Sequence, residues 1–224
     1  MFKHETQVIK FLLQWYSMNA RKLPWRKKNN LNLPHPYFVF VSEYMLQQTT
    51  VNTVKNKFND FILKWPSLNK LAQTSEPNIL KFWSGLGYYS RARNLLKSAK
   101  IIKKNFKNNI PKTYDELIQL PGIGDYTAKA ILGIGFNQPV MPLDANIERI
   151  LVRLYAIDKP INKVKNKLKD IGKKFISDKY SSNLIQSFMD YGSEICLPRN
   201  PKCNICGINK FCQSYKKNLQ QKIP

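Results

Sequence analysis

The sequence has 224 residues, of which 43% are hydrophobic, and its formal net charge at pH 7 is +23. This length and composition allow a sizeable buried core, which excludes an intrinsically disordered chain. No apolar run reaches the roughly 18 residues that cross a bilayer, and the N-terminus lacks the pattern of a secretory signal, so we expect a cytoplasmic protein without membrane contact. The charge indicates a polyanionic partner such as DNA. A solvated basic face is the alternative, since lysine supplies most of the basic residues.

The first two predicted elements are helices. Segment 5–18 repeats apolar residues every three or four positions, which is typical of an amphipathic helix. The apolar run 37–41 is also compatible with a buried strand by its composition. However, Pro36 suits a first helical turn, and apolar residues continue through Leu46 without a turn signal. We therefore predict a helix at this position too.

A third helix is predicted between Tyr88 and Phe106. Leu95, Ala99, Ile102 and Phe106 recur there at spacings of three and four, opposite a face of Arg and Lys. We expect these four residues to belong to the core. Pro and Gly residues divide the remaining chain into short helices, and no other segment alternates convincingly as a strand would. The predicted fold class is all-α.

Two glycines, Gly122 and Gly124, surround one apolar residue directly before an apolar-periodic helix. Glycine lets the backbone turn tightly and approach a ligand closely. The start of the following helix offers unpaired N–H groups and a positive dipole end. This pattern indicates a hairpin between two helices that binds a phosphate, with an ordinary helix–helix turn as the alternative.

All four cysteines lie near the C-terminal end, at Cys196, Cys203, Cys206 and Cys212. Their clustering indicates a single metal site, because nothing in the sequence points to the oxidising compartment that disulfides require. Four thiolates without a nearby histidine suit either tetrahedral zinc or an iron–sulfur cluster, and spacing alone separates the two poorly.

Taken together, these features resemble the helix-hairpin-helix DNA glycosylases of the iron–sulfur endonuclease III superfamily. The resemblance extends over nearly the whole chain. Its most specific stretches are L-P-W-R at 23–26, V-S-E-Y-M-L-Q-Q-T at 41–49, G-L-G-Y-Y-S-R-A-R at 85–93, L-P-G-I-G at 120–124, and the C-x6-C-x2-C-x5-C tail. It implies a 4Fe-4S cluster on the four cysteines. It also implies two lobes: a six-helix lobe with the hairpin at about 30–135, and a second lobe from the N-terminal helix plus 136–224.

Within this superfamily the sequence is most similar to the members that remove adenine. The resemblance implies a monomeric, monofunctional glycosylase of base excision repair, acting on double-stranded DNA at adenine mispaired with 8-oxoguanine or guanine. Such members commonly carry a C-terminal domain that recognises 8-oxoguanine. Because this sequence ends at Pro224, soon after Cys212, we expect it to lack that domain.

Cleavage of an N-glycosidic bond needs an acid at the base and a negative charge beside the sugar, which two carboxyl groups in different environments supply. The resemblance assigns these roles to Glu43 and Asp144, with Asn146 orienting Asp144 or a water and Tyr126 supporting the geometry. Glu43 lies in an otherwise uncharged run, where burial should raise its pKa towards neutrality, with a surface glutamate as the alternative. Asp144 also occupies a typical N-cap position, and the two roles are compatible. Ala145 departs from the glycine usual in adenine-removing members.

Position 126 separates two reaction types. Bifunctional relatives carry a lysine there, whose amine forms a Schiff base with the sugar and then nicks the strand. Tyr126 therefore implies hydrolysis without efficient strand cleavage, although Lys129 lies on the same helix face and could support weak lyase activity. Two alternatives stay open: an endonuclease III-like lyase acting on oxidised pyrimidines, and a non-catalytic DNA-binding iron–sulfur protein.

To reach a base inside a duplex, an enzyme must extrude it and fill the gap. The resemblance assigns contacts with DNA or the extruded base to Arg26, Gln48, Thr49, Leu86, Tyr88, Gly122, Gly124 and Gln186. In this assignment Gln48 and Tyr88 fill the gap, and Gln186 bonds the adenine. Core packing is the alternative for Leu86 and Tyr88, and an ordinary polar helix position is the alternative for Gln186.

Overall fold

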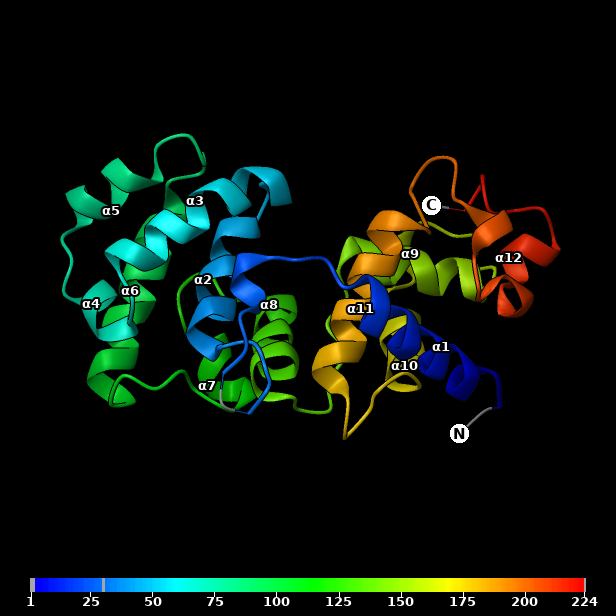
Figure 1. Cartoon of the computed structure of the whole chain (residues 1–224), viewed down its shortest axis with the longest axis horizontal. Helices are drawn as coiled ribbons and strands as arrows, with labels where there is room; N and C mark the ends of the chain where they lie inside the picture. Colours follow the sequence, from blue (N-terminus) through cyan, green and yellow to red (C-terminus); the bar gives the residue numbers. More distant parts are fainter. Residues whose placement is uncertain (1–2, 30, 224) are drawn as a thin grey trace. The chain divides into compact units, whose positions relative to one another are not determined.

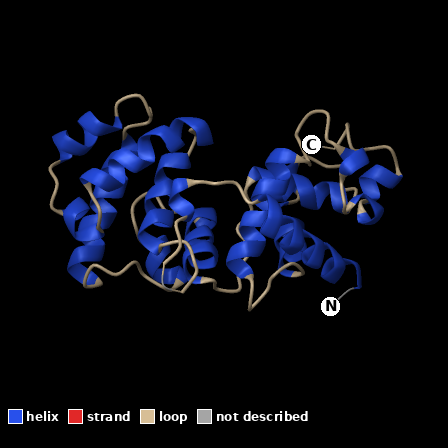
Figure 2. Cartoon of the chain, in the orientation of Figure 1, coloured by secondary structure: helices blue, strands red, loops and turns tan. Residues whose placement is uncertain are grey.

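The computed structural model describes residues 3–29 and 31–223. Helices supply the regular structure of these residues (Figure 2). Their only β-type pairing is an isolated bridge between Lys28 and Pro34. The predicted all-α class is confirmed. Within these ranges no helix is long and apolar enough to cross a membrane.

The chain divides into two compact units. The hairpin unit runs from Lys22 to Phe136, and the cysteine unit combines the N-terminal segment through Arg21 with the chain from Asn137 onward. In chain order (Figure 1), the hairpin unit contains η1 (Pro24–Arg26), α2 (Pro36–Leu46), α3 (Val51–Lys64), α4 (Leu68–Ala72), α5 (Glu76–Trp83), α6 (Ser90–Asn105), α7 (Tyr114–Ile118), α8 (Asp125–Ala130) and the π-helical turn η2 (Ile131–Gly135).

Helix α2 is the central element of the hairpin unit. It contacts α3, α6, α8 and η2, and most of its side chains are buried. Pro36 occupies its first turn, and Nδ1 of His35 accepts a hydrogen bond from the Tyr37 N–H at 3.2 Å. The helix predicted for 37–41 is therefore confirmed. Because α2 is enclosed by other helices, it shows no amphipathic pattern, which is why its composition is also compatible with a strand.

Helix α6 confirms the third predicted helix with shorter bounds. Leu95, Ala99 and Ile102 are fully buried, as expected. Phe106, in contrast, is only half-buried, so its assignment to the core was wrong. It lies one residue beyond the helix end, where its N–H still bonds the carbonyl of Ile102 at 2.9 Å while its side chain is partly open to solvent.

The cysteine unit contains α1 (Lys3–Asn19), α9 (Ala145–Leu154), η3 (Ile161–Lys163), α10 (Lys165–Lys173), α11 (Ser181–Glu194), η4 (Cys203–Ile205), η5 (Asn209–Phe211) and α12 (Gln213–Lys216). Helix α11 packs against both α1 and α9, and α9 also contacts α10 and α12. The short cysteine-bearing turns lie beside the C-terminal part of α9, because Ile150, Arg153 and Leu154 line one cavity together with the four cysteines.

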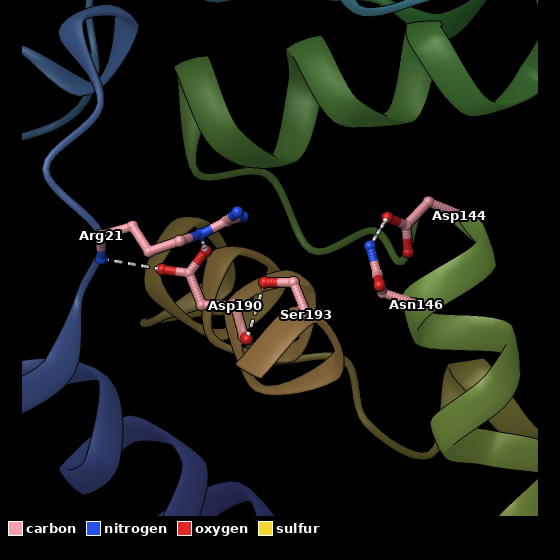
Figure 3. Close-up of polar contacts among 5 residues, drawn as sticks. All are labelled: Arg21, Asp144, Asn146, Asp190 and Ser193. Carbon is pink, nitrogen blue, oxygen red and sulfur yellow. Dashed lines mark hydrogen bonds and ion pairs between the residues drawn. The ribbon is translucent and has the colours of Figure 1, made fainter. Parts of the chain in front are cut away.

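A buried ion pair fixes the end of α1 to α11. Asp190 is fully buried, and its carboxylate accepts one hydrogen bond from the Arg21 Nε at 2.6 Å and one from the Arg21 backbone N–H at 3.1 Å (Figure 3). A buried carboxylate requires such partners, because an uncompensated charge in the interior is costly. This pair therefore ties the N-terminal segment to a unit formed mainly by the C-terminal third of the chain.

Candidate functional site

The predicted hairpin is formed by residues 120–124, between α7 and α8. Gly122 has φ +80°, and a Cβ there would lie 3.0 Å from the Cβ of Asn94 and 3.1 Å from Cε1 of Tyr44. Glycine is therefore required at this position by both conformation and space. The Tyr44 hydroxyl donates to the carbonyl of Pro121 at 2.5 Å, which braces the hairpin against α2.

The second hairpin glycine is explained differently. Gly124 has a negative φ, and a Cβ there would meet open space. It caps α8 without a side-chain hydrogen bond, so the N–H groups of the first turn have no acceptor from the cap residue. An exposed, uncapped helix start is compatible with a phosphate contact, which stays a prediction.

Glu43 lies on α2 and is only 6% exposed. Its neighbours along the helix, Ser42 and Tyr44, are also buried, so a surface position for Glu43 is ruled out. Burial of this kind suits a carboxyl group that acts as a proton donor.

Two loops of the hairpin unit carry the residues expected to fill the gap in DNA. Gln48 and Tyr88 both have positive φ, +55° and +48°, although neither is glycine. Tyr88 is 61% exposed, whereas Leu86 is buried. The Thr49 hydroxyl donates to the carbonyl of Leu86 at 3.2 Å, which joins the two loops directly. Core packing therefore accounts for Leu86 and does not account for Tyr88.

Tyr126 and Arg26 are both half-buried, Tyr126 on α8 and Arg26 at the end of η1. Lys129, the candidate for weak lyase activity, forms an ion pair with Asp125, with Nζ and Oδ1 2.8 Å apart. The ion pair directs the Lys129 side chain towards Asp125.

In the cysteine unit, Asp144 is the N-cap residue of α9. Its Oδ1 accepts a hydrogen bond from the Ile147 N–H at 2.7 Å. Its Oδ2 accepts one from Nδ2 of Asn146 at 2.9 Å, which Figure 3 shows. Burial raises the pKa of Asp144, while these two donors and the charge of Arg149 act in the opposite direction. Ala145 begins α9 and is exposed, so the helix accommodates the departure from glycine.

Asn146, which donates to Asp144, is itself hydrogen-bonded by Arg149. Nη2 of Arg149 donates to Oδ1 of Asn146 at 2.8 Å and to the carbonyl of Gly192 at 2.6 Å, and its Nε donates to the carbonyl of Cys196 at 2.7 Å. A continuous hydrogen-bonded chain therefore runs from the Asp144 carboxylate to the main chain of the first cysteine.

Gln186 lies on α11 and is only 2% exposed. Its Nε2 donates to the carbonyl of Ser182 at 3.0 Å, within the same helix. Its Oε1 is buried and has no hydrogen-bond partner. Because an orphaned buried acceptor is costly, a solvated helix position does not explain this side chain.

The four cysteines line one cavity, together with Arg153 of α9. Arg153 donates from Nη1 to Sγ of Cys196 at 3.4 Å, and the Tyr191 hydroxyl donates to Sγ of Cys206 at 3.2 Å. Burial raises the pKa of Cys206 to about 11, and the neighbouring thiols add to this effect. Four thiols enclosed in this way ionise together only when a cationic centre balances their charge, so the donor set fits a metal group.

In residues 3–29 and 31–223, no set of three or more His, Cys, Asp or Glu side chains is arranged to hold a single metal ion.

The predicted site residues are thus distributed over both units. The hairpin unit carries Glu43, Tyr126 and the expected DNA contacts other than Gln186, and the cysteine unit carries Asp144, Asn146, Gln186 and the four cysteines. Sequence reasoning missed three buried arginines that organise these groups, Arg91, Arg149 and Arg153. The sequence does carry one signal for two of them. Arg149 and Arg153 lie one turn apart, on the same side of a strongly amphipathic helix, which indicates that they could share a buried environment.

Comparison with known proteins places these features in a family. The sequence matches the HhH-GPD superfamily base excision DNA repair protein family over residues 41–174. An adenine DNA glycosylase of Buchnera aphidicola subsp. Baizongia pistaciae is 46% identical over 92% of this chain, which spans 58% of that relative's length. A solved thermostable thymine-DNA glycosylase aligns with a TM-score of 0.86 at 25% identity, covering 96% of this chain and 98% of that one.

An endonuclease III–DNA complex shares the fold, with a TM-score of 0.76 at 20% identity over 98% of this chain and 100% of that one. The fold is therefore the helix-hairpin-helix DNA glycosylase fold expected from the sequence. The chain belongs to the HhH-GPD superfamily of base excision DNA repair proteins.

Proposed function

We propose that this chain is a monofunctional DNA glycosylase that releases adenine by hydrolysing its N-glycosidic bond. The Asp144 carboxylate carries the proposal. Capping α9 requires only Oδ1, which accepts the hydrogen bond from the Ile147 N–H. Oδ2 nevertheless accepts a second hydrogen bond, from Asn146, and the amide of Asn146 is itself hydrogen-bonded by Arg149. An orientation fixed beyond the needs of the cap indicates a chemical role. The adenine DNA glycosylase of Buchnera aphidicola supports adenine as the base removed.

The two carboxyl groups divide the chemistry between them. Glu43 donates a proton to N7 of the adenine, which makes the base a better leaving group as the C1′–N9 bond breaks. The electron pair of that bond leaves with the base, and the sugar becomes an oxocarbenium ion. Asp144 stabilises this cation, and Asn146 keeps the carboxylate oriented. A water molecule then adds to C1′, loses a proton, and completes the hydrolysis; Tyr126 supports this geometry.

The remaining predicted residues bind the DNA. Gly122 and Gly124 bring the hairpin backbone and the start of α8 close to a phosphate. Gln48 and Tyr88 occupy the space left by the extruded base, with Thr49 and Leu86 supporting them. Gln186 binds the extruded adenine: its unpartnered Oε1 can accept a hydrogen bond from the N6 amino group once the base is bound. Arg26 is a further contact with the DNA.

A 4Fe-4S cluster is the metal group that we assign to Cys196, Cys203, Cys206 and Cys212. When bound, it supplies a covalent tie across the loop between these residues. The cavity that the four thiols share supports this assignment. The same loop carries Arg199, Lys202 and Lys210, so a rigid loop would present positive charge to phosphates.

A single-turnover assay tests the proposed function. The complete chain is mixed in excess with duplexes containing A:8-oxoguanine, A:G or thymine glycol, and released base and strand breaks are quantified separately. We expect adenine release from the two mispairs and no release from thymine glycol, with a monomer on size-exclusion chromatography. Release from thymine glycol would support the endonuclease III-like alternative. Duplex binding without any base release would support a non-catalytic role.

A further inference from the structure

Arg91, the second residue of α6, is only 5% exposed, which is unusual for an arginine. Its two terminal nitrogens contact six acceptors. Nη1 reaches the carbonyls of Tyr44 at 3.2 Å, Met45 at 2.7 Å and Gln47. Nη2 reaches Oγ1 of Thr49 at 2.8 Å and the carbonyls of Leu86 at 2.8 Å and Gly87 at 3.0 Å.

These acceptors belong to two separate stretches of chain. Nη1 bonds the C-terminal end of α2 and the loop that follows it, and Nη2 bonds that loop and the loop between α5 and α6. Two of these acceptors, on Gln47 and Thr49, flank Gln48 in the chain. A third, the carbonyl of Gly87, directly precedes Tyr88. The guanidinium carbon also lies 5.5 Å from the centre of the Tyr88 ring. One side chain therefore holds both loops that carry the gap-filling residues.

Both loops contain a residue in the left-handed region, Gln48 and Tyr88. Non-glycine residues persist there only where their surroundings over-determine the backbone, and such strain is concentrated at functional sites. The carbonyls that Arg91 bonds stand next to these two residues. Arg91 therefore holds the strained conformations in place together with the direct Thr49–Leu86 hydrogen bond.

Building on the proposed function, we infer that Arg91 is a positioning residue for base extrusion. It holds Gln48 and Tyr88 ready to enter the duplex before DNA binds. Because the loops are already ordered, inserting Gln48 and Tyr88 into the duplex costs no further conformational entropy. More of the free energy of DNA binding can then offset the cost of unstacking the adenine. Arg91 itself does not contact the reacting atoms.

The planar guanidinium is essential to this role. Its two terminal nitrogens diverge in a fixed fork and can bond two loops at once. A lysine ammonium is a single point donor on a flexible chain. Arg91→Lys therefore keeps the charge and most of the packing, and cannot hold both loops in register.

The test compares Arg91→Lys and Arg91→Met with the wild-type chain. The matched control is Arg93→Met, because Arg93 lies on the same helix, is half exposed, and pairs with Glu76 on the surface. Each variant is measured for thermal stability, for affinity towards undamaged duplex, for single-turnover adenine release, and for fluorescence of 2-aminopurine placed beside the target adenine. The fluorescence rises when stacking is lost, so it reports extrusion independently of chemistry.

We expect Arg91→Lys to remain folded and to bind undamaged duplex within about threefold of wild type, because phosphate contacts elsewhere are intact. Its 2-aminopurine signal and its rate of adenine release should both fall at least about tenfold. Arg93→Met should match the wild type in both. A wild-type signal and rate in Arg91→Lys would overturn the inference, and so would losses matched by an equal loss in duplex affinity.

If both Arg91 variants fail to fold, Thr49→Val supplies the test, since it removes one acceptor of Nη2 and the bond to Leu86 and keeps Arg91. We expect a smaller loss of the extrusion signal, and an unchanged signal would overturn the inference. Failure of the proposed function looks different. A wild-type chain that extrudes the base and releases none would refute the glycosylase activity, and the comparison between Arg91 and its variants would still be measurable.

Discussion

Asn146 holds the carboxylate of Asp144 through a hydrogen bond of 2.9 Å that the N-cap of α9 does not require. The amide is itself fixed by Arg149, whose guanidinium bonds the main chain of Cys196. The carboxyl group that we propose acts beside the sugar and the loop that would hold the metal cluster are therefore parts of one hydrogen-bonded assembly within the cysteine unit.

Replacing Asp144 with Asn should remove catalysis and keep the fold. Asparagine caps helices about as well as aspartate, but it carries no charge to stabilise a cationic sugar. We expect adenine release to fall by roughly 10²–10³-fold, the range found when an electrostatic donor or anion is removed from a reaction centre. Single-turnover kinetics and thermal unfolding of the same samples provide the measurement. Wild-type turnover would remove Asp144 from the mechanism.

The pH dependence of stability follows from the same residue. Burial raises the pKa of Asp144 in the folded chain above its ordinary value of 3.8. The folded state then holds this proton to higher pH than the unfolded state, so the contribution of Asp144 to stability falls as pH rises from about 4 through the raised pKa. Asp144→Asn should gain thermal stability relative to wild type over that interval. A difference in melting temperature that is independent of pH would contradict a raised pKa.

Glu43→Gln should abolish adenine release and preserve DNA binding, because the amide fills the same buried space and cannot donate the carboxyl proton. General acid catalysis contributes roughly 10²–10⁴-fold, so we expect a loss of that size. Binding is measured by fluorescence anisotropy and release by single turnover. Glu76→Gln, on the exposed surface of α5, is the control that should leave both unchanged. Release at the wild-type rate in Glu43→Gln would exclude the residue as the acid.

Arg149→Met should weaken both the fold and the chemistry. The substitution leaves the carbonyls of Gly192 and Cys196 and the Oδ1 of Asn146 without this donor, and each buried acceptor left unpaired costs about 1–3 kcal/mol. We expect a lower free energy of unfolding in denaturant titrations. At temperatures where the variant is still folded, adenine release should also be slower. Lys173→Met, which breaks an exposed pair with Asp170, is the matched control and should change neither.

Borohydride trapping should separate the two glycosylase reaction types. The wild-type chain should give no efficient covalent adduct with DNA, because Tyr126 has no amine and Lys129 is paired with Asp125. Tyr126→Lys should gain an adduct, and adding Lys129→Ala to that variant should leave the adduct unchanged. An efficient adduct in the wild type that is lost in Lys129→Ala would show that Lys129 acts as a nucleophile.

The local patterns of the sequence determined the helices, the hairpin and the cysteine cluster. Segment 37–41 could be read as helical because Pro36 marks a helix start and no turn signal interrupts the apolar run. Gly122 could be assigned to a tight turn because its neighbours in the chain define that turn. The roles of Glu43 and Asp144 came from motif similarity, and they stay predictions. Phe106 was misplaced because helical periodicity does not say where a helix ends.

Tertiary structure alone decided how the three buried arginines act. Arg91 bonds carbonyls up to 47 residues away in the chain, and Arg149 and Arg153 bond those of the cysteine loop at similar separations. Every residue carries a backbone carbonyl, so an arginine that binds carbonyls leaves no complementary residue type in the sequence to identify its partner. Folding brings those oxygens together around each guanidinium. Only the tertiary structure therefore shows that these arginines are buried and bind several carbonyls, whereas the sequence alone suggests ordinary charged surface residues.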